Sequence, residues 1–228
     1  MSTITTHPKT TAIRIPIDGR TWLNADIAVP PDAKGLVLFA HGSGSGRHSP
    51  RNRYVASELN LLQMATVLAD LLTDEEENVD DRTGALRFDI PLLTNRLVAM
   101  VDWTRTYDPV AALPIGVFGA STGAAAALDA AALRPGIVRA VVSRGGRPDL
   151  ATRLEEVKAP ALLIVGGNDT TVLELNRAAS RQLTCTRLIE VIPGATHLFE
   201  EPGTLEAVAA AAGAWFRQHL ASVPARPS

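Results

Sequence analysis

The sequence predicts an α/β fold: one domain built on a mostly parallel, doubly wound sheet of about eight strands. The first observation is a series of near-continuous apolar runs, which is typical of strands buried on both faces of a parallel sheet. The second is that stretches with helical periodicity separate most of these runs. The third is composition, because 228 residues with 46% hydrophobic and 20% charged side chains suit a single globular domain.

The expected elements follow in order along the chain. Residues 12–17 and 22–29 are expected to form two strands joined at Asp18-Gly19, a common hairpin dipeptide, at an antiparallel edge of the sheet. Buried strands are expected over residues 35–40, 65–72, 114–119, 138–143, 161–165 and 188–192. Helices are expected over residues 50–64, 91–106, 122–133, 171–183 and 204–220.

The segments between these elements carry their own predictions. The acidic run 74–82 is interpreted as a solvated loop, although its place after a strand leaves Glu75 or Glu76 as alternative site residues. Residues 143–161 leave room for one short helix but for no large cap domain, so the site is expected to be open. Residues 1–11 and 221–228 are expected to be flexible ends of a domain spanning residues 12–220.

Charge and composition limit the classes of binding partner that are expected. A net charge of −2 with mixed signs gives no basis for binding nucleic acid or an anionic membrane surface, so a small molecule is expected instead. No signal peptide is visible, and the apolar stretch 208–216 is far shorter than the ~20 residues of a membrane helix, which favours the cytoplasm. Cys185 is the single cysteine and cannot form an intrachain disulfide. The chain is expected to be a monomer or a homodimer.

A serine between two glycines is the most informative motif. Gly119-Ala120-Ser121-Thr122-Gly123 follows an apolar run and precedes a strong helix former, which is the context of a nucleophile elbow. In such an elbow the serine sits on a tight strand-to-helix turn, and larger side chains two positions away would clash. Ser121 is therefore the predicted nucleophile.

A serine hydroxyl needs a base, and the base needs a carboxylate that orients it. Residues 161–165 run into a glycine turn that ends at Asp169, and the next apolar run leads to His197 in the same way. The order serine, acid, histidine predicts a triad of Ser121, Asp169 and His197. An alternative for Asp169 is to cap the helix that follows it, and Asp149 and Glu174 are alternative acids.

Two backbone amides are predicted to bind the negative oxygen of the tetrahedral intermediate. Thr122 follows the nucleophile at the amino end of a helix, where the dipole favours an anion. Ser43 lies in the glycine-rich loop 41–46 after an earlier strand. This loop matches neither a dinucleotide fingerprint nor a Walker loop, and His41 and His48 have no partners at metal-ligand spacing, so no cofactor and no metal are expected. His41 is expected to brace the loop.

Several arginines are candidates for binding an anionic group on a substrate. They follow the glycine-rich loop and a later strand, and with one histidine they make up the set Arg47, His48, Arg51 and Arg144. The alternative is that they are ordinary surface or packing residues.

Four motifs spread over most of the chain, H-G-S-G, G-A-S-T-G, G-G-N-D and G-A-T-H, resemble those of the α/β-hydrolase superfamily. The run 41–52 resembles the dienelactone-hydrolase-like branch in particular. Dienelactone hydrolases proper use a cysteine nucleophile, whereas this elbow carries Ser121. The resemblance therefore implies a serine enzyme of carboxylesterase type and does not identify the substrate.

The expected function is hydrolysis of small or exposed carboxylic esters through an acyl-enzyme. One alternative uses the same triad as a thioesterase, peptidase or acyltransferase. Another is a hydrolase fold kept as a non-catalytic binding module, against which the intact triad argues.

Overall fold

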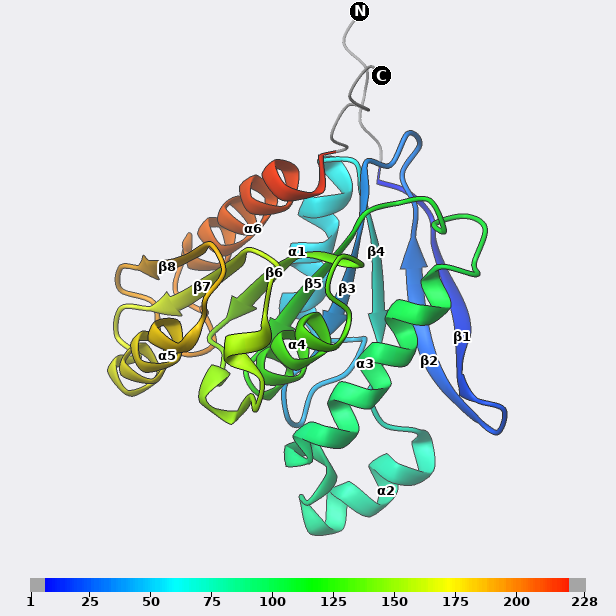
Figure 1. Cartoon of the computed structure of the whole chain (residues 1–228), viewed down its shortest axis with the longest axis horizontal. Coiled ribbons are helices and arrows are strands. Elements are labelled where there is room, and N and C mark those ends of the chain that lie inside the picture. The colour runs from blue at the N-terminus through cyan, green and yellow to red at the C-terminus, as the bar shows by residue number, and fades with distance from the viewer. Residues whose placement is uncertain (1–6, 222–228) are drawn as a thin grey trace, which may run out of the picture.

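The computed structural model describes residues 7–221 as an eight-stranded sheet with helices on both faces (Figure 1). The strand order is β1-β2-β4-β3-β5-β6-β7-β8. The strands are β1 Thr10–Asp18, β2 Thr21–Ala28, β3 Gly35–Ala40, β4 Met64–Ala69, β5 Ile115–Ala120, β6 Val138–Arg144, β7 Ala161–Gly166 and β8 Arg187–Ile192. From β4 to β8 every neighbouring pair is parallel, while β1 and β2 are antiparallel. The predicted α/β class and mostly parallel sheet are confirmed.

The β1–β2 hairpin forms where its dipeptide predicts it. The Asp18 carboxylate accepts hydrogen bonds from the N–H of Thr21 at 2.8 Å and of Arg20 at 3.1 Å, which closes the turn. β1 begins at Thr10, two residues before the expected start of the domain. Of the other residues in the two expected flexible ends, 1–6 and 222–228 lie outside the described part of the chain.

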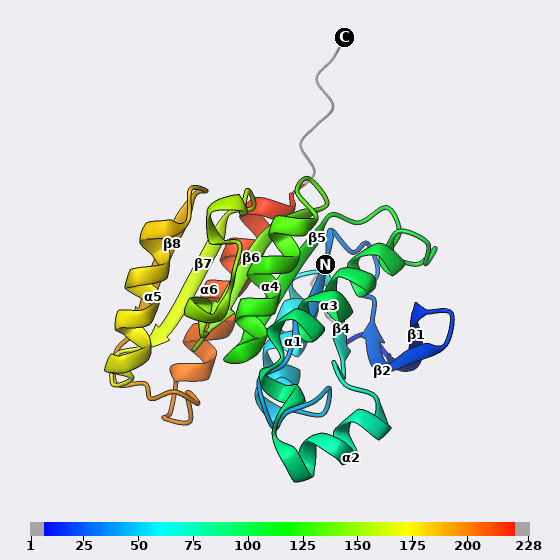
Figure 2. The ribbon, with the colours of Figure 1, turned by 60° about the horizontal axis from the view of Figure 1, so that its bottom comes forward.

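Two helical layers cover the sheet, as Figure 2 shows. On one face, α1 Pro50–Leu61 and α6 Thr204–Leu220 pack over a core that includes Phe39, Phe118 and Phe216. On the other face lie α3 Ile90–Thr104, α4 Thr122–Leu133 and α5 Thr170–Gln182. Parallel strands buried on both faces place their carboxyl ends at one edge of the sheet, and the loops at that edge carry the candidate site.

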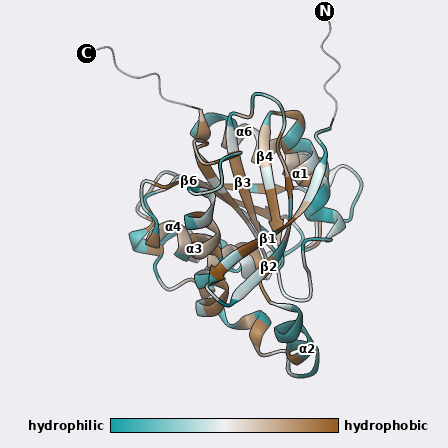
Figure 3. Ribbon diagram, turned by 90° about the vertical axis from the view of Figure 1, so that its right-hand side faces the viewer, coloured by the Kyte–Doolittle hydropathy of each residue, from teal (hydrophilic) through white to brown (hydrophobic). Residues whose placement is uncertain are grey.

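The prediction of a solvated loop over residues 74–82 is wrong, because Asp74–Thr83 forms helix α2. Thr73 accepts the N–H of Glu76 while the Glu76 carboxylate accepts the N–H of Thr73, which is a capping box. Acidic residues in the first turn suit the positive end of the helix, and Gly84 ends it with a φ of +64°. In Figure 3 α2 stands out from the rest of the fold and is largely hydrophilic.

Smaller differences concern the ends of elements. The first expected helix stops at Leu61 because Gln63, with a φ of +61°, turns the chain into β4. Between β6 and β7 the chain carries only two short 3-10 turns, at Pro148–Leu150 and Leu154–Glu156, and no cap domain. Within residues 7–221, no helix is both long and apolar enough to cross a membrane.

Candidate active site

Ser121 occupies a strained turn between β5 and α4. Its φ of +50° and ψ of −122° lie in a region that non-glycine residues rarely adopt, and such strain is often found at functional positions. Ser121 is the residue directly before α4, so its backbone sits at the positive end of that helix. The predicted elbow conformation is present.

Positions 119 and 123 of the motif have no room for a side chain, so both must be glycine. A Cβ on Gly119 would lie 2.5 Å from Cα of Ala124, and one on Gly123 would lie 2.3 Å from the carbonyl oxygen of Ala40. Both contacts are with backbone, which cannot rotate away. The steric reason inferred from the sequence is thereby confirmed.

Asp169 and His197 meet at the carboxyl edge of the sheet. Oδ2 of Asp169 lies 2.7 Å from Nδ1 of His197, and the carboxylate is more deeply buried than the imidazole, with 14% and 39% of the side chains exposed. Asp169 stands at the start of α5, but its side chain makes no capping hydrogen bond there. The carboxylate is directed to the histidine instead of to the helix.

The two alternative acids have other partners. Asp149 forms two hydrogen bonds with Arg147, at 2.9 and 2.8 Å, and Glu174 forms an exposed ion pair with Arg177. Neither contacts His197 among the interactions of residues 7–221. The acid that reaches the histidine is Asp169.

Hydrogen bonds join the loop that carries Asp169 to the loop that carries His197. Asn168 donates its backbone N–H to Ala195 and its side-chain Nδ2 to the carbonyl of Gly194, both at 2.9 Å. Within the histidine loop, Glu201 accepts the hydroxyl of Thr196 at 2.6 Å and its N–H at 3.1 Å. The Asp169–His197 contact is therefore held from both sides.

Ser121 and His197 approach each other around the end of β6. The N–H of Ser121 donates to the carbonyl of Arg144 at 3.2 Å. A Cβ on the next residue, Gly145, would lie 3.0 Å from the carbonyl oxygen and 3.6 Å from the ring Cε1 of His197. Arg144 therefore contacts the serine, and its neighbour Gly145 lies against the histidine. Within the described chain no hydrogen bond joins the Ser121 hydroxyl to His197, and such contacts often tighten only when substrate binds.

The glycine-rich loop lies against Ser121. A Cβ on Gly42 would stand 2.9 Å from Cβ of Ser121, so only glycine allows this approach. Among the backbone hydrogen bonds of residues 7–221, neither Ser43 nor Thr122 gives its N–H to an acceptor. The two amides selected from the sequence therefore remain available as donors.

His41 is buried and braces this loop. Its Nε2 accepts the N–H of Leu71 at 2.9 Å, which leaves the proton on Nδ1 to be donated to the carbonyl of Gly42 at 3.0 Å. Burial lowers the pKa of His41, so the ring is neutral at neutral pH. Its role in shaping the loop agrees with the expectation from the sequence.

The four predicted substrate-binding residues separate into two pairs. Arg47 forms an ion pair with Asp70, and His48 lies 3.9 Å from the carboxylate of Asp26, so both are directed toward β2 and β4. Arg51 forms an ion pair with Glu200 instead, and its charge lowers the pKa of Arg144. A single cluster of all four does not form.

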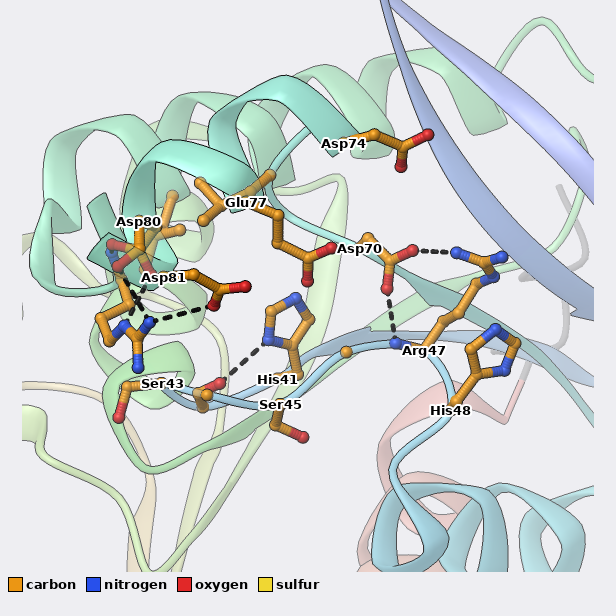
Figure 4. A pocket seen from close by; sticks show the side chains of 16 residues that line it. His41, Ser43, Ser45, Arg47, His48, Asp70, Asp74, Glu77, Asp80 and Asp81 are labelled. Carbon is orange, nitrogen blue, oxygen red and sulfur yellow. Dashed lines mark hydrogen bonds and ion pairs between the residues drawn. The ribbon is translucent and has the colours of Figure 1, made fainter. Parts of the chain in front are cut away.

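A cavity of about 450 Å³ opens between the glycine-rich loop and α2 (Figure 4). Its wall includes Gly42 and Ser43 but not Ser121, and α2 supplies Glu77, which extends toward His41. Burial, and after it the nearby Asp70 and Asp81, raise the pKa of Glu77. The sequence named Glu75 or Glu76 for this role, whereas the helical turn brings Glu77 to the cavity.

The residues that hold the site in place were not predicted from the sequence. Asn168 stands in the G-G-N-D motif, and its hydrogen bond to Gly194 is formed across two loops that are distant in sequence. Glu201 follows Thr196 by five residues and gave no periodic signal. The T-x-x-E pattern at Thr73 and Glu76 was visible and would have identified α2.

Comparison with known proteins gives a consistent assignment. A crystal structure of dienelactone hydrolase from Anabaena variabilis is 53% identical, with a TM-score of 0.92 over 94% of this chain and 100% of that one. An α/β serine hydrolase without lid from Xanthomonas campestris shares the fold at 20% identity, with a TM-score of 0.75 over 95% and 97% of the two chains.

Two Mycobacterium tuberculosis proteins, from two strains, are 57% identical over 195 residues and carry the name "Putative phosphoribosyl transferase". The match covers 85% of this chain but 43% of those proteins, so the chain spans less than half of their length. The sequence profile of the dienelactone hydrolase family matches residues 59–221. This chain belongs to the dienelactone hydrolase family.

Proposed function

We propose that this chain is a serine hydrolase of carboxylesterase type. The observation that carries the proposal is the 2.7 Å contact between Asp169 and His197, formed at the edge of the sheet where Ser121 occupies its strained turn. A histidine oriented by a carboxylate, near a half-buried serine on a strained turn, suits nucleophilic attack on a carbonyl.

In the proposed reaction the Ser121 oxygen attacks the ester carbonyl while Nε2 of His197 takes its proton. Asp169 holds the proton on Nδ1 and stabilises the imidazolium that forms. The N–H groups of Ser43 and Thr122 donate to the oxygen that becomes negative, and each such donor is typically worth about 3 kcal/mol in the transition state. The imidazolium then protonates the leaving alcohol, and water releases the acid from the acyl-enzyme by the same steps.

Small or exposed esters are the proposed substrates. The segment between β6 and β7 contains short turns and no lid, so a long acyl chain would find no cover there. Thioesterase, peptidase and acyltransferase activities on the same three residues are the alternatives to this proposal. The transferase name of the two mycobacterial proteins belongs to chains more than twice as long as the matched part, and the region shared with them has the hydrolase fold.

The test combines labelling with turnover. The protein is treated with a fluorophosphonate, the adduct is mapped by mass spectrometry, and p-nitrophenyl ester, thioester and anilide substrates are assayed in parallel. We expect one adduct on Ser121, its loss in Ser121→Ala, and fastest turnover of the ester. A folded protein that neither labels at Ser121 nor turns over any of the three substrates would favour a binding module.

A further inference from the structure

Arg144, the last residue of β6, is a buried cation without a partner. Only 7% of the residue is exposed, and its Nε and Nη1 have no hydrogen-bond acceptor. Burial, reinforced by the nearby Arg51, lowers the pKa of Arg144 to about 10. The guanidinium therefore remains charged at neutral pH.

The position of Arg144 places it beside the proposed nucleophile. Alternate side chains of β6, Ala140 and Val142, belong to the core under α1 and α6, so Arg144 extends to the same face. Its own carbonyl accepts the N–H of Ser121 at 3.2 Å. The guanidinium therefore lies on the α1 side of the elbow.

A second cation, Arg51, is close enough for its charge to act on Arg144. Arg51, in the first turn of α1, has a buried Nε without an acceptor, and its Nη1 donates to Glu200 at 3.2 Å. Glu200 follows His197 by three residues and is mostly exposed, so it shares only part of the charge of Arg51. Arg144 has no carboxylate within ion-pair distance among residues 7–221.

An arginine in this state is energetically unusual. A buried charge is normally paired, because taking it out of water is costly unless an opposite charge and hydrogen bonds compensate. Two guanidinium groups with free N–H donors, one of them in the first turn of a twelve-residue helix, suit an oxyanion with two or more acceptor oxygens. An anion from outside the chain would neutralise this buried positive charge and accept its free N–H groups.

We propose that Arg144 and Arg51 form an anion subsite beside Ser121 that binds a carboxylate or phosphate group carried by the ester substrate. The inference rests on the proposed function and deepens it, because it defines a substrate with two parts. The carbonyl is attacked by Ser121, and the oxyanion is held on the α1 side of the elbow. Arg47 and His48 take no part, since their carboxylate partners lie on the other side.

The first test compares matched esters. The ratio of kcat/KM for mono-p-nitrophenyl succinate over p-nitrophenyl butyrate is measured in the unchanged protein and in Arg144→Met, with an acetyl ester of glycerol 3-phosphate as a separate arm. We expect the ratio for one of the two anionic esters to fall at least about tenfold in Arg144→Met, in line with loss of a charge-assisted hydrogen bond. The arm that falls identifies carboxylate or phosphate. An equal ratio in both proteins for both esters overturns the proposal.

Arg147→Met is the matched control. Arg147 follows the same strand by three residues, but it is paired with Asp149, so its loss is expected to leave the ratio unchanged. Arg51→Met is expected to lower the ratio less than Arg144→Met does, because Glu200 already shares the charge of Arg51.

A binding measurement on the unchanged protein tests the proposal even if Arg144→Met fails to fold. Succinate and inorganic phosphate are added at constant ionic strength against chloride, and Tm is followed. We expect one of the two to raise Tm by a few degrees and to inhibit butyrate ester hydrolysis competitively. A rise in Tm without any esterase activity would support the anion site while the proposed function fails. Turnover of the butyrate ester with neither a Tm shift nor inhibition would overturn the anion site alone.

Discussion

Nδ1 of His197 and Oδ2 of Asp169 lie 2.7 Å apart although the two residues follow different strands and are 28 positions apart in the chain. The contact depends on the parallel pairing of β7 and β8, which brings the loops after both strands to one edge. Asn168 then ties the two loops together through Gly194 and Ala195. The orientation of the imidazole is thus a consequence of sheet topology as well as of one hydrogen bond.

Replacing Asp169 with asparagine is expected to lower kcat for p-nitrophenyl acetate by roughly 10²- to 10⁴-fold, because the amide no longer fixes the proton on Nδ1 or stabilises the imidazolium. Circular dichroism should remain unchanged. Asp149→Asn is the control, since that carboxylate pairs with Arg147 and not with His197. Near-normal turnover by Asp169→Asn would contradict the assigned role.

Gly123→Ala is expected to destabilise the fold by roughly 1–3 kcal/mol or more, as overpacking does, because the new Cβ would lie 2.3 Å from the backbone oxygen of Ala40. Urea unfolding followed by fluorescence gives the free energy of unfolding. Gly19→Ala is the matched control, since no atom lies within 4 Å of a Cβ at that hairpin position. Equal midpoints for the two variants would show that the elbow tolerates a side chain at position 123.

The elbow and the order of the site residues could be predicted from sequence because each residue lies within a few positions of the end of an apolar strand. Parallel strands bring such positions to one edge, so Ser121, Asp169 and His197 could be assigned without knowing any contact. The capping alternative for Asp169 could not be resolved in this way. It depended on where one side chain points, and that side chain makes no capping bond.

The arginines were harder to predict for a similar reason. Arg47 pairs with Asp70, which is 23 residues away and directly follows β4, and nothing local in the sequence indicates that pairing. Arg144, in contrast, is notable because its buried Nε and Nη1 have no hydrogen-bond partner. A pattern of residue types does not show which charges find partners once the chain is packed.

Stability is expected to depend on pH through Glu201. Hydrogen bonds from the Thr196 hydroxyl and from backbone N–H groups lower the pKa of Glu201 below its ordinary value of 4.5. The ionised carboxylate therefore stabilises the folded state above the unfolded-state pKa, and this contribution is lost as pH falls through the folded-state pKa. Unfolding of the unchanged protein and of Glu201→Gln should differ at pH 7 and converge on acidification below 4.5.

Glu155→Gln serves as the comparison for that experiment, since Glu155 is exposed in a short turn away from the histidine loop. A difference between Glu201→Gln and the unchanged protein that persists at low pH would point to packing, not ionisation, as the cause. Because Glu201 braces the loop of His197, the same variant is also expected to lower kcat at neutral pH.

The capping box of α2 gives the last prediction. Thr73→Ala removes the oxygen that accepts the N–H of Glu76, and such a loss typically costs about 1 kcal/mol of helix stability. Because α2 projects from the fold, the effect should appear as faster amide hydrogen exchange in α2, by about fivefold for that energy. Thr73→Ser keeps the capping oxygen and should exchange like the unchanged protein. If both variants exchange alike, the acidic first turn and the ion pair of Glu76 with Arg96 hold the helix without the cap.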